Sequence, residues 1–541
     1  MGSGLINMAE AAAAKNVKPD HNISADSLVD IPKITDKNVK EIDFMPIQEP
    51  FSYVRILLKT DTQDYVYQIL EPVLNKKEDD ALNFILNTID MTLTYDEPVG
   101  QDEESNVVEE KNNMLKDIIK QIVKDYHMDL PKKSLDKIVY YILRDFVGYG
   151  KIEAPFKDLN VEDISCDGPE IPVFLYHRDY GSIRSNIIYE SDDELDSHVI
   201  SLSQRSNQTI SVANPILDGT LPDGSRINAT FGRDITTRGS SYTIRKFKED
   251  PLTVVDLINF GTLCPEMGAH LWLAVQYGES MIFAGGSASG KTSTMNAIAM
   301  FIPPSSKVIS IEDTREVNIP HENWIAGLTR GGAESDEEGS IDMYQLLRAA
   351  LRQRPEYVLV GEVRGKETMT MFQAMATGHT TYSTMHADSV QSIVYRLENP
   401  PIEIPRVLLN ALNMVIIHKH MRIKGQRLRR ITTITEIVGI EPSTLEIITN
   451  QVFSHTPAGD KFIYGGHSNL YEKVMDREDM TLDEVLAEVN RRSDVIRYLI
   501  QNDIRDYINV TNTVSEYYTD PEAIFKEMKK KIDYSKVKRI M

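Results

Sequence analysis

One stretch of the chain has the residue types that hold phosphate groups. It reads Gly285, Gly286, Ser287, Ala288, Ser289, Gly290, Lys291 and Thr292, and it matches the pattern G-x-x-x-x-G-K-[ST] in full. The glycines let backbone N–H groups converge on phosphate oxygens, and a following helix adds its positive end. Lys291 would reach the β- and γ-phosphates, and the Thr292 hydroxyl would ligate magnesium. A helical pattern opens at Ser293, so we expect residues 285–293 to bind a nucleotide.

Acidic residues that could serve such a site follow two apolar, strand-like runs. One run ends in Gly361-Glu362, which places Glu362 at the C-terminal edge of a strand, where α/β sheets bind ligands. We expect Glu362 to be a metal ligand. The other run leads into Glu312, Asp313 and Glu316, and Glu312 is the candidate for polarising an attacking water. A surface glutamate and a solvated acidic turn are the alternative interpretations.

Two histidines flank a third strand-like run. His379 and His386 are seven residues apart, so they could lie at its two ends. A neutral histidine can hydrogen-bond a γ-phosphate or a catalytic carboxylate and so report the state of the nucleotide. No cysteine and no helical H-x-x-x-H pattern accompanies the pair, which argues against zinc. Two hydrogen-bonded structural histidines would give the same pattern.

The composition is that of an acidic globular protein. The 541 residues include 59 Lys and Arg against 81 Asp and Glu, which gives a formal net charge of −22. Such a surface is a poor match for nucleic-acid backbones or an anionic membrane unless basic residues cluster locally.

Two cysteines, Cys166 and Cys264, exclude a disulfide framework. No apolar run approaches the roughly 18 residues that span a bilayer, and no secretory signal is visible. We expect a cytoplasmic protein.

Changes in pattern along the chain predict four segments. Residues 1–43 look like a disordered tail, and 44–245 like an α+β domain of short strands, turns and helices. A polar stretch that contains a proline suggests a linker over 246–256. Within 257–541, strands and helices alternate, which is typical of a mainly parallel α/β sheet. We expect the C-terminal part of that domain to be largely helical.

The four motifs together resemble the secretion-ATPase superfamily, which includes the type II and type IV secretion and pilus motors. Members of that family carry a phosphate loop, an acidic box, a strand ending in Gly-Glu and a histidine box in this order. Further segments resemble its archaeal branch, and the similarity covers roughly residues 46–510. These segments are 163–168, 221–226, 243–247, 351–355 and 504–507. Archaellum motors and archaeal pilus or secretion ATPases share the motifs, so the sequence does not separate them.

The resemblance implies a ring-shaped homohexamer with a RecA-like C-terminal domain. ATP would bind with Mg²⁺ between the two domains, and arginines of the N-terminal domain would reach its phosphates. By motif position these are Arg226 and Arg245, with Arg233 and Arg238 as weaker candidates and surface ion pairs as the alternative. The predicted catalytic set combines the residues named so far. It comprises Lys291, Glu312, Glu362, His379, His386, Arg226 and Arg245.

The resemblance also implies a partner, a polytopic platform protein in the membrane, which would hold the ring at the inner face of the cell membrane. Two basic runs, 418–430 and 526–539, could touch that partner or the membrane surface. A solvated hairpin and a solvated terminal helix are the simpler interpretations of the two runs. A platform-coupled motor is therefore the expected function.

Three other functions fit parts of the pattern. A nucleic-acid motor would share the phosphate loop, but the net charge of −22 and only two tryptophans count against it. A nucleotide-binding assembly protein without turnover is disfavoured by intact Lys291, Thr292, Glu312 and Glu362. A small-molecule kinase would leave the large first domain unexplained.

Overall fold

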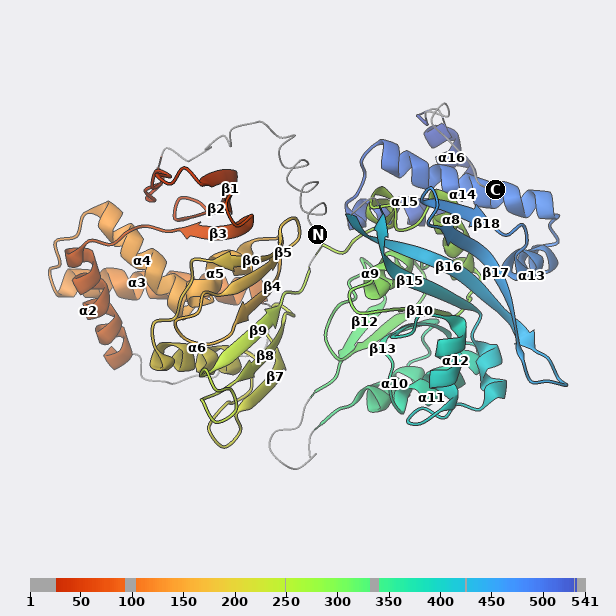
Figure 1. Cartoon of the computed structure of the whole chain (residues 1–541), viewed down its shortest axis with the longest axis horizontal. Coiled ribbons are helices and arrows are strands. Elements are labelled where there is room, and N and C mark those ends of the chain that lie inside the picture. Colours follow the sequence, from red (N-terminus) through yellow and green to blue (C-terminus); the bar gives the residue numbers. More distant parts are fainter. Residues whose placement is uncertain are drawn as a thin grey trace. The chain divides into compact units, whose positions relative to one another are not determined.

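The sequence pattern changes near residue 247, and the fold divides into two units at the same place. The computed structural model describes residues 26–92, 104–248, 250–330, 340–423, 426–529 and 531–532. The chain divides into two units between Phe247 and Lys248, and each is described here by itself (Figure 1). This division falls inside the predicted linker. Helix α7 (Val254–Asn259) already begins there, with a capping box between Thr253 and Asp256.

The N-terminal unit is built on a nine-stranded sheet with the order β1-β2-β3-β6-β5-β4-β9-β8-β7. Among the strands that the structure describes in this unit, only β3 and β6 pair in parallel, so the unit has the expected α+β character. The strands are β1 (Val39–Gln48), β2 (Ser52–Lys59), β3 (Asp64–Leu70), β4 (Val161–Cys166), β5 (Phe174–His177), β6 (Gly181–Ser185), β7 (Ile216–Thr220), β8 (Arg226–Thr230) and β9 (Ser241–Arg245).

Ordered structure begins earlier than the sequence predicts. Strand β1 starts at Val39, within the segment assigned to a tail, and it pairs along its length with β2. Val29 is buried with Tyr53 and Leu70 in a small apolar cluster. The polar residues between these contacts hide the signal in the sequence. The first 25 residues and the acidic segment 334–338 lie outside the described residues.

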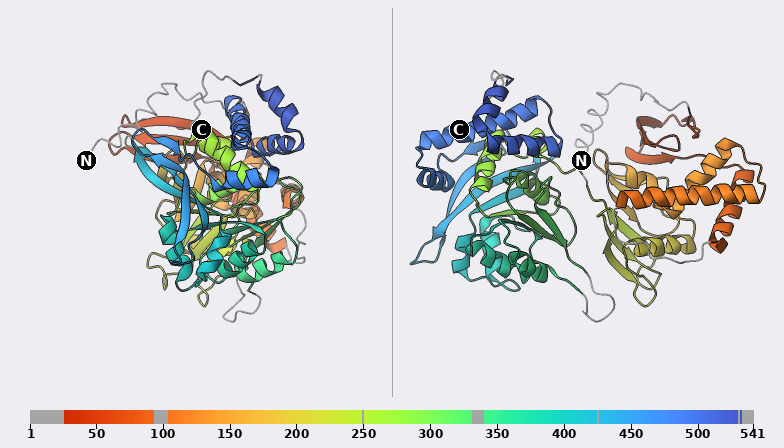
Figure 2. Two further views of the ribbon diagram at one scale, coloured as in Figure 1. Left: turned by 90° about the vertical axis from the view of Figure 1, so that its right-hand side faces the viewer. Right: turned by 180° about the vertical axis from the view of Figure 1, so that it is seen from behind.

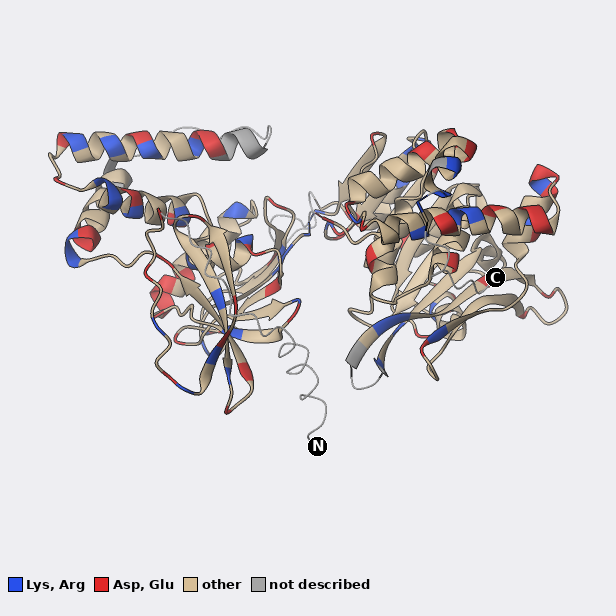
Figure 3. Cartoon of the chain, turned by 90° about the horizontal axis from the view of Figure 1, so that it is seen from above, with Lys and Arg blue, Asp and Glu red and all other residues tan. Residues whose placement is uncertain are grey.

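Helices complete the N-terminal unit. They are α2 (Lys76–Thr92), α3 (Glu104–Asp125), α4 (Lys132–Phe146), the short η1 (Gly150–Ile152), α5 (Glu153–Lys157) and α6 (Asp192–Arg205). The first three form a bundle around its own core of buried isoleucines, such as Ile85, Ile119 and Ile142. The exposed side of α3 carries charges of both signs (Figure 3). Such mixed charge is typical of a solvated helix face.

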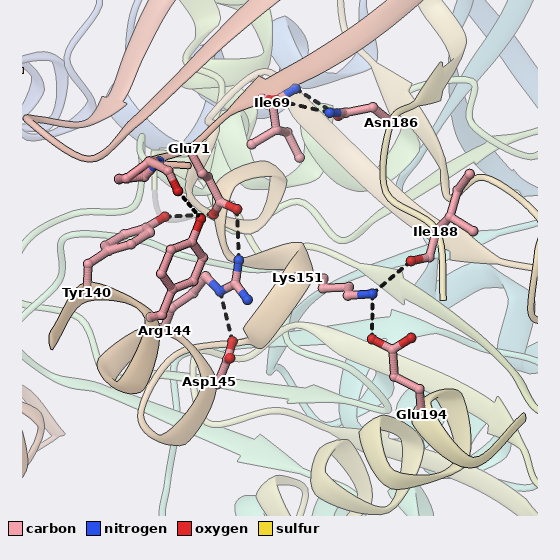
Figure 4. A network of polar contacts seen from close by, with 11 residues as sticks. Ile69, Glu71, Tyr140, Arg144, Asp145, Lys151, Asn186, Ile188 and Glu194 are labelled. Atoms are coloured by element: carbon pink, nitrogen blue, oxygen red, sulfur yellow. Dashed lines mark hydrogen bonds and ion pairs between the residues drawn. The ribbon is translucent and has the colours of Figure 1, made fainter. Parts of the chain in front are cut away.

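A polar network ties the bundle to the sheet (Figure 4). Arg144 of α4 donates to the carboxylate of Glu71, just after β3, with an N–O distance of 2.8 Å. The Tyr140 hydroxyl donates to the same carboxylate at 2.7 Å. Lys151 bridges Glu194 of α6 and the carbonyl of Ile188. Because these charges are partly buried, their pairing holds the elements in one arrangement.

The C-terminal unit is a second nine-stranded sheet with the order β12-β11-β13-β14-β10-β15-β16-β17-β18. The first five strands in this order run parallel, and β15 continues parallel to β10. They are β10 (Met281–Gly285), β11 (Val308–Glu312), β12 (Trp324–Leu328), β13 (Tyr357–Glu362) and β14 (Thr380–Met385). From β15 onward, four consecutive strands pair antiparallel with one another. They are β15 (Met414–Ile423), β16 (Gln426–Ile440), β17 (Ile447–Thr456) and β18 (Lys461–Tyr464).

Helices cover both faces of this sheet (Figures 1 and 2). One face packs under α7, α8 and α9 and the C-terminal helices, with Trp272 and Phe301 at its centre. The other face packs under α10, α11 and α12. The helices are α8 (Pro265–Gln276), α9 (Lys291–Ala299), α10 (Met343–Leu351), α11 (Glu367–Ala376), α12 (Val390–Glu398), η2 (Arg406–Ala411), α13 (Asn469–Glu478), α14 (Leu482–Gln501), α15 (Tyr507–Thr519) and α16 (Pro521–Lys529).

The α/β prediction for this unit is confirmed. Residues 414–464 form the strands β15 to β18, so the C-terminal part is less helical than the sequence predicts, whereas the hairpin interpretation of residues 418–430 agrees with β15 and β16. Polar residues such as Lys419 and Arg422 interrupt the apolar alternation of β15 and β16, so the pattern did not show two long strands. From Asn469 onward the described chain is helical, and α14 opens with the capping box between Thr481 and Glu484. No helix in the described ranges is long and apolar enough to cross a membrane.

Candidate active site

The phosphate loop connects the central strand β10 to helix α9. Gly290 caps the helix with φ of 95°, a left-handed conformation that glycine adopts without strain. Ala288, at φ of 54°, is also left-handed, which is costly for a residue with a side chain and typical of functional loops. At Gly285 a Cβ atom would lie 2.5 Å from Ser289 Oγ and 2.6 Å from the His418 carbonyl oxygen. Only glycine fits there.

The loop offers donors that suit phosphate oxygens. Ser289 is 1% exposed, and its hydroxyl has no hydrogen-bond partner among the described residues. Lys291 is also buried, and its Nζ donates to the Gly286 carbonyl at 3.0 Å. Gly286 is exposed and has open space where a side chain would be. A buried, unpaired hydroxyl beside a buried ammonium and a helix N-terminus fits an anionic ligand with several oxygens.

The parallel register brings the other motifs to the same edge of the sheet. In neighbouring strands Ile311 lies beside Val360, and Val360 beside Ser383. Ala284 of β10 lies beside Met385 of β14. The strands β11, β13, β14 and β10 are thus neighbours about 4.8 Å apart, and all end at one edge. Glu312, Glu362, His386 and the phosphate loop follow those ends in a row.

Glu312 is a buried carboxyl group. It is 2% exposed, and its Oε1 accepts hydrogen bonds from the backbone N–H groups of Glu316 and Val317 at 3.1 and 3.0 Å. Burial raises the pKa of Glu312 to about 7, and the two backbone donors offset part of that effect. A carboxyl group with a pKa near neutrality is suited to general base catalysis.

Glu362 and His386 form a pair at the ends of β13 and β14. Their Oε1 and Nε2 atoms are 3.1 Å apart, and both side chains are partly exposed. Arg364, two residues after Glu362, donates to Asp313 at 3.2 Å and so connects the acidic box to the β13 loop. The structure therefore brings together one histidine and the carboxylates that follow the two strands.

Comparison with known proteins gives the family. Residues 173–520 match the model of the family described as type II/IV secretion system protein. An uncharacterized protein of Methanocaldococcus jannaschii is 34% identical over 505 residues, which cover 89% of this chain and 90% of that protein. The chain belongs to the type II/IV secretion system protein family. As a member of the family, it is an ATPase with a RecA-like C-terminal unit.

Other family members and solved structures are more distant. The type IV secretion system protein PtlH of Bordetella pertussis is 30% identical over 226 residues, covering 38% of this chain and 67% of PtlH. The VirB11 ATPase of the Brucella suis type IV secretion system is 25% identical, with a TM-score of 0.27 over 51% of this chain and 89% of VirB11. The pilus retraction motor PilT with bound ADP is 16% identical, with a TM-score of 0.38 over 68% of this chain and 93% of PilT.

The structure does not bring His379 to the sheet edge where Glu362 and His386 lie. His379 precedes β14 and His386 follows it, so the six residues of the strand separate them by about 20 Å. Its Nδ1 lies 3.3 Å from the Ala374 carbonyl oxygen and 3.3 Å from Thr377 Oγ1, at the end of α11. These contacts fit a local structural role.

The predicted arginines belong to the N-terminal unit of the ATPase. Arg226 and Arg245 are opposite each other on β8 and β9, so the sheet brings these two candidates together. Arg226 pairs with Asp218 at 2.9 Å, and both side chains are about half exposed. Arg233 pairs with Asp192 at 2.8 Å. Exposed pairs of this kind exchange partners at little cost, because each contributes under about 1 kcal/mol.

One residue beside the loop was not singled out from the sequence. His418 of β15 is fully buried next to Gly285. Its Nδ1 lies 3.2 Å from the Ala284 carbonyl oxygen, and its Nε2 lies 3.0 Å from Thr294 Oγ1 on α9. Burial lowers the pKa of His418 to about 4, so the ring is neutral. The sequence carried one indication of this place. His418 follows Ile416 by two residues, and alternate residues of a strand share a face, so a side chain on the buried face is expected there.

The magnesium ligands remain a prediction. The Thr292 hydroxyl and the Glu362 carboxylate have the hard oxygen atoms that Mg²⁺ prefers. Within the ranges that the structure describes, no three His, Cys, Asp or Glu side chains form a group that could hold a metal ion. Mg²⁺ bound with few protein ligands and with nucleotide oxygens is consistent with the residues present.

The buried carboxyl group predicts a stability that depends on pH. The pKa of Glu312 is about 7 when folded and 4.5 when solvated, so ionisation above pH 4.5 costs the folded state free energy. We expect the ligand-free Glu312→Gln variant to equal the wild type at pH 4 and to be more stable by about 3 kcal/mol at pH 8. Calorimetry of the C-terminal unit measures this difference.

The exposed Glu322→Gln variant is the matched control, and we expect no such trend for it. A difference between Glu312→Gln and the wild type that stays constant from pH 4 to pH 8 would contradict the raised pKa.

Proposed function

We propose that this ATPase is a hexameric motor that powers assembly of an archaellum, a type IV pilus or a type II-like secretion system. It would act through a polytopic membrane platform protein, at the cytoplasmic face of the membrane. The observation that carries the proposal is the row formed by the phosphate loop, Glu312 and the Glu362–His386 pair along one sheet edge. Membership of the type II/IV secretion family supports it.

Each residue in this row has a proposed role in ATP hydrolysis. The loop residues 285–293 hold the phosphates through backbone N–H groups, and Lys291 neutralises the β- and γ-phosphates. Thr292 and Glu362 would hold Mg²⁺, whose positive charge would offset the negative charge of the phosphates. Glu312 orients and polarises the attacking water, for which its raised pKa suits it.

His386 is proposed to transmit the nucleotide state. Its ring contacts the Glu362 carboxylate, so any change in the ligands of Glu362 changes the charge that His386 faces. Arg226 and Arg245 are proposed to reach the phosphates from an N-terminal unit of the ring and to stabilise transition-state charge. Closing and opening of the domains around ATP would supply the mechanical step.

The proposal predicts that ATP hydrolysis needs magnesium and Glu312. It also predicts that nucleotide favours formation of a hexamer. We expect Glu312→Gln to lower kcat at least about 100-fold, because water positioning contributes strongly to phosphoryl transfer. Steady-state ATP hydrolysis and light-scattering mass, each with and without nucleotide, are the measurements. Glu322→Gln is the control for a change of charge.

Three results would count against this proposal. Unchanged turnover in Glu312→Gln would move the catalytic role elsewhere. A wild-type monomer with no turnover, even with membranes that contain the platform protein, would contradict the motor. Strong stimulation by DNA or RNA would favour a nucleic-acid motor.

Donation of Arg226 between protomers predicts complementation. An Arg226→Ala protomer keeps its own Glu362 but has no guanidinium to give to its neighbour, whereas a Glu362→Gln protomer can supply the arginine to the site of an Arg226→Ala neighbour. We expect each variant alone to be nearly inactive and a mixed ring to recover activity at about a quarter of its sites. Steady-state hydrolysis after mixing at equal concentration tests this. Mixed rings that stay inactive would remove the support for donation between protomers.

A further inference from the structure

The hairpin of β15 and β16 runs past the phosphate loop. His418 of β15 lies beside Gly285, where β10 ends, and β15 continues for five more residues to Ile423. At about 3.3 Å per residue, the hairpin extends roughly 17 Å beyond the end of β10. Lys and Arg residues, coloured blue in Figure 3, are frequent on this part of the hairpin. The basic run noted in the sequence therefore lies next to the nucleotide site.

One arginine of the hairpin reaches the loop itself. Arg429 of β16 is opposite His420 of β15. A Cβ atom placed on Gly290 would lie 3.8 Å from Arg429 Cδ, so the arginine stem packs against the residue that caps α9. The guanidinium is exposed and makes no hydrogen bond or ion pair with the residues that the structure describes.

Arg430, the residue after Arg429, anchors strand β16 through hydrogen bonds. The Arg430 guanidinium donates to both carboxylate oxygens of Asp460 at 2.9 and 2.8 Å and to the Phe260 carbonyl at 2.9 Å. His455 Nε2 lies 2.7 Å from the same carboxylate. The Arg430 side chain is 5% exposed, and its hydrogen bonds hold the pKa of Asp460 well below its usual range. Such a buried bidentate pair is rigid, and it sets the place of Arg429.

Several positive charges lie close together at the start of α9. Arg429 and Lys291 both lie at the N-terminus of α9, whose backbone adds a partial positive charge. The unpartnered hydroxyl of Ser289, which is 1% exposed, lies in the same loop. Like charges and an unpaired buried donor are unfavourable together unless a ligand supplies negative oxygen atoms.

We propose that Arg429 is a further nucleotide-binding residue and that its guanidinium contacts the phosphate chain of the nucleotide in the loop of the same protomer. This inference rests on the proposed function only in that the loop binds a nucleotide. Arginine suits the contact because its planar guanidinium is always charged and binds two phosphate oxygens at once. The phosphates would thus be held by the loop on one side and by the hairpin on the other.

Binding of ADP to the full chain tests this inference. We expect Arg429→Ala to raise the Kd for fluorescently labelled ADP about tenfold or more, because hydrogen bonds to charged groups are among the strong ones. Arg429→Lys should lie between the wild type and the alanine variant. Inorganic tripolyphosphate, which has no base or ribose, should lose affinity by the same factor.

Lys419→Ala is the matched control. Lys419 lies on the same hairpin, is exposed and pairs with Arg430 rather than with Arg429. We expect the Kd of Lys419→Ala for labelled ADP to stay within about twofold of the wild-type value, because salt screens a charge that does not touch the ligand. The thermal midpoint without nucleotide should be unchanged in both alanine variants, whereas added ADP should raise it less in Arg429→Ala.

Two results would overturn the inference. Equal ADP affinities in Arg429→Ala and Lys419→Ala would show that the Arg429 guanidinium does not contact the phosphate chain. Weaker binding of ADP with unchanged binding of tripolyphosphate would place Arg429 on the base or ribose. Failure of the proposed function is distinguishable: a wild type that binds ADP but does not hydrolyse ATP contradicts the motor and leaves the contact of Arg429 intact.

Discussion

The parallel alignment of β11, β13, β14 and β10 is the constraint on which the rest of the site depends. The side chains within these strands are buried, so the strands cannot slide without exposing apolar residues or moving them to the wrong face. Because the strands run in the same direction, the residues that follow them meet at one edge. Residues from Gly285 to His386, which are far apart in sequence, thereby form one row.

The phosphate loop depends on a second contact, on the other side of β10. Strand β15 approaches Gly285 so closely that a side chain there would collide with the His418 carbonyl group. The neutral His418 ring then joins the Ala284 carbonyl to Thr294 of α9. The antiparallel extension of the sheet is thus part of the nucleotide site. A buried acid at Glu312 adds a local cost to stability, as is common where a side chain must react.

Much of this site was predictable from short patterns. The loop, Glu312 and Glu362 each follow an apolar run of strand length, and such runs predict parallel strands that end at one edge. His379 and His386 show the limit of that logic. The sequence placed both around one strand, but only the histidine after the strand reaches the carboxylates.

Long-range contacts were the part that the sequence could not supply. The strands β15 and β16 carry charged residues where they extend beyond their neighbours, so their alternation was masked. The sequence indicated a hairpin over residues 418–430 only as one interpretation, and it did not predict the full length of the two strands. The proximity of Arg429 to Gly290 depends on a register between strands and on the anchor of Arg430 to Asp460. No spacing within the chain reveals either contact.

Amide hydrogen exchange with a non-hydrolysable ATP analogue and Mg²⁺ tests the central claim most directly. The account predicts slower exchange in the loop, 286–293, and also after β11 and β13, in 312–317 and 361–363. These segments share one sheet edge, so a ligand held there should protect all of them. Protection confined to 286–293, with unchanged exchange after β11 and β13, would contradict the claim that the loop and the carboxylates form one site.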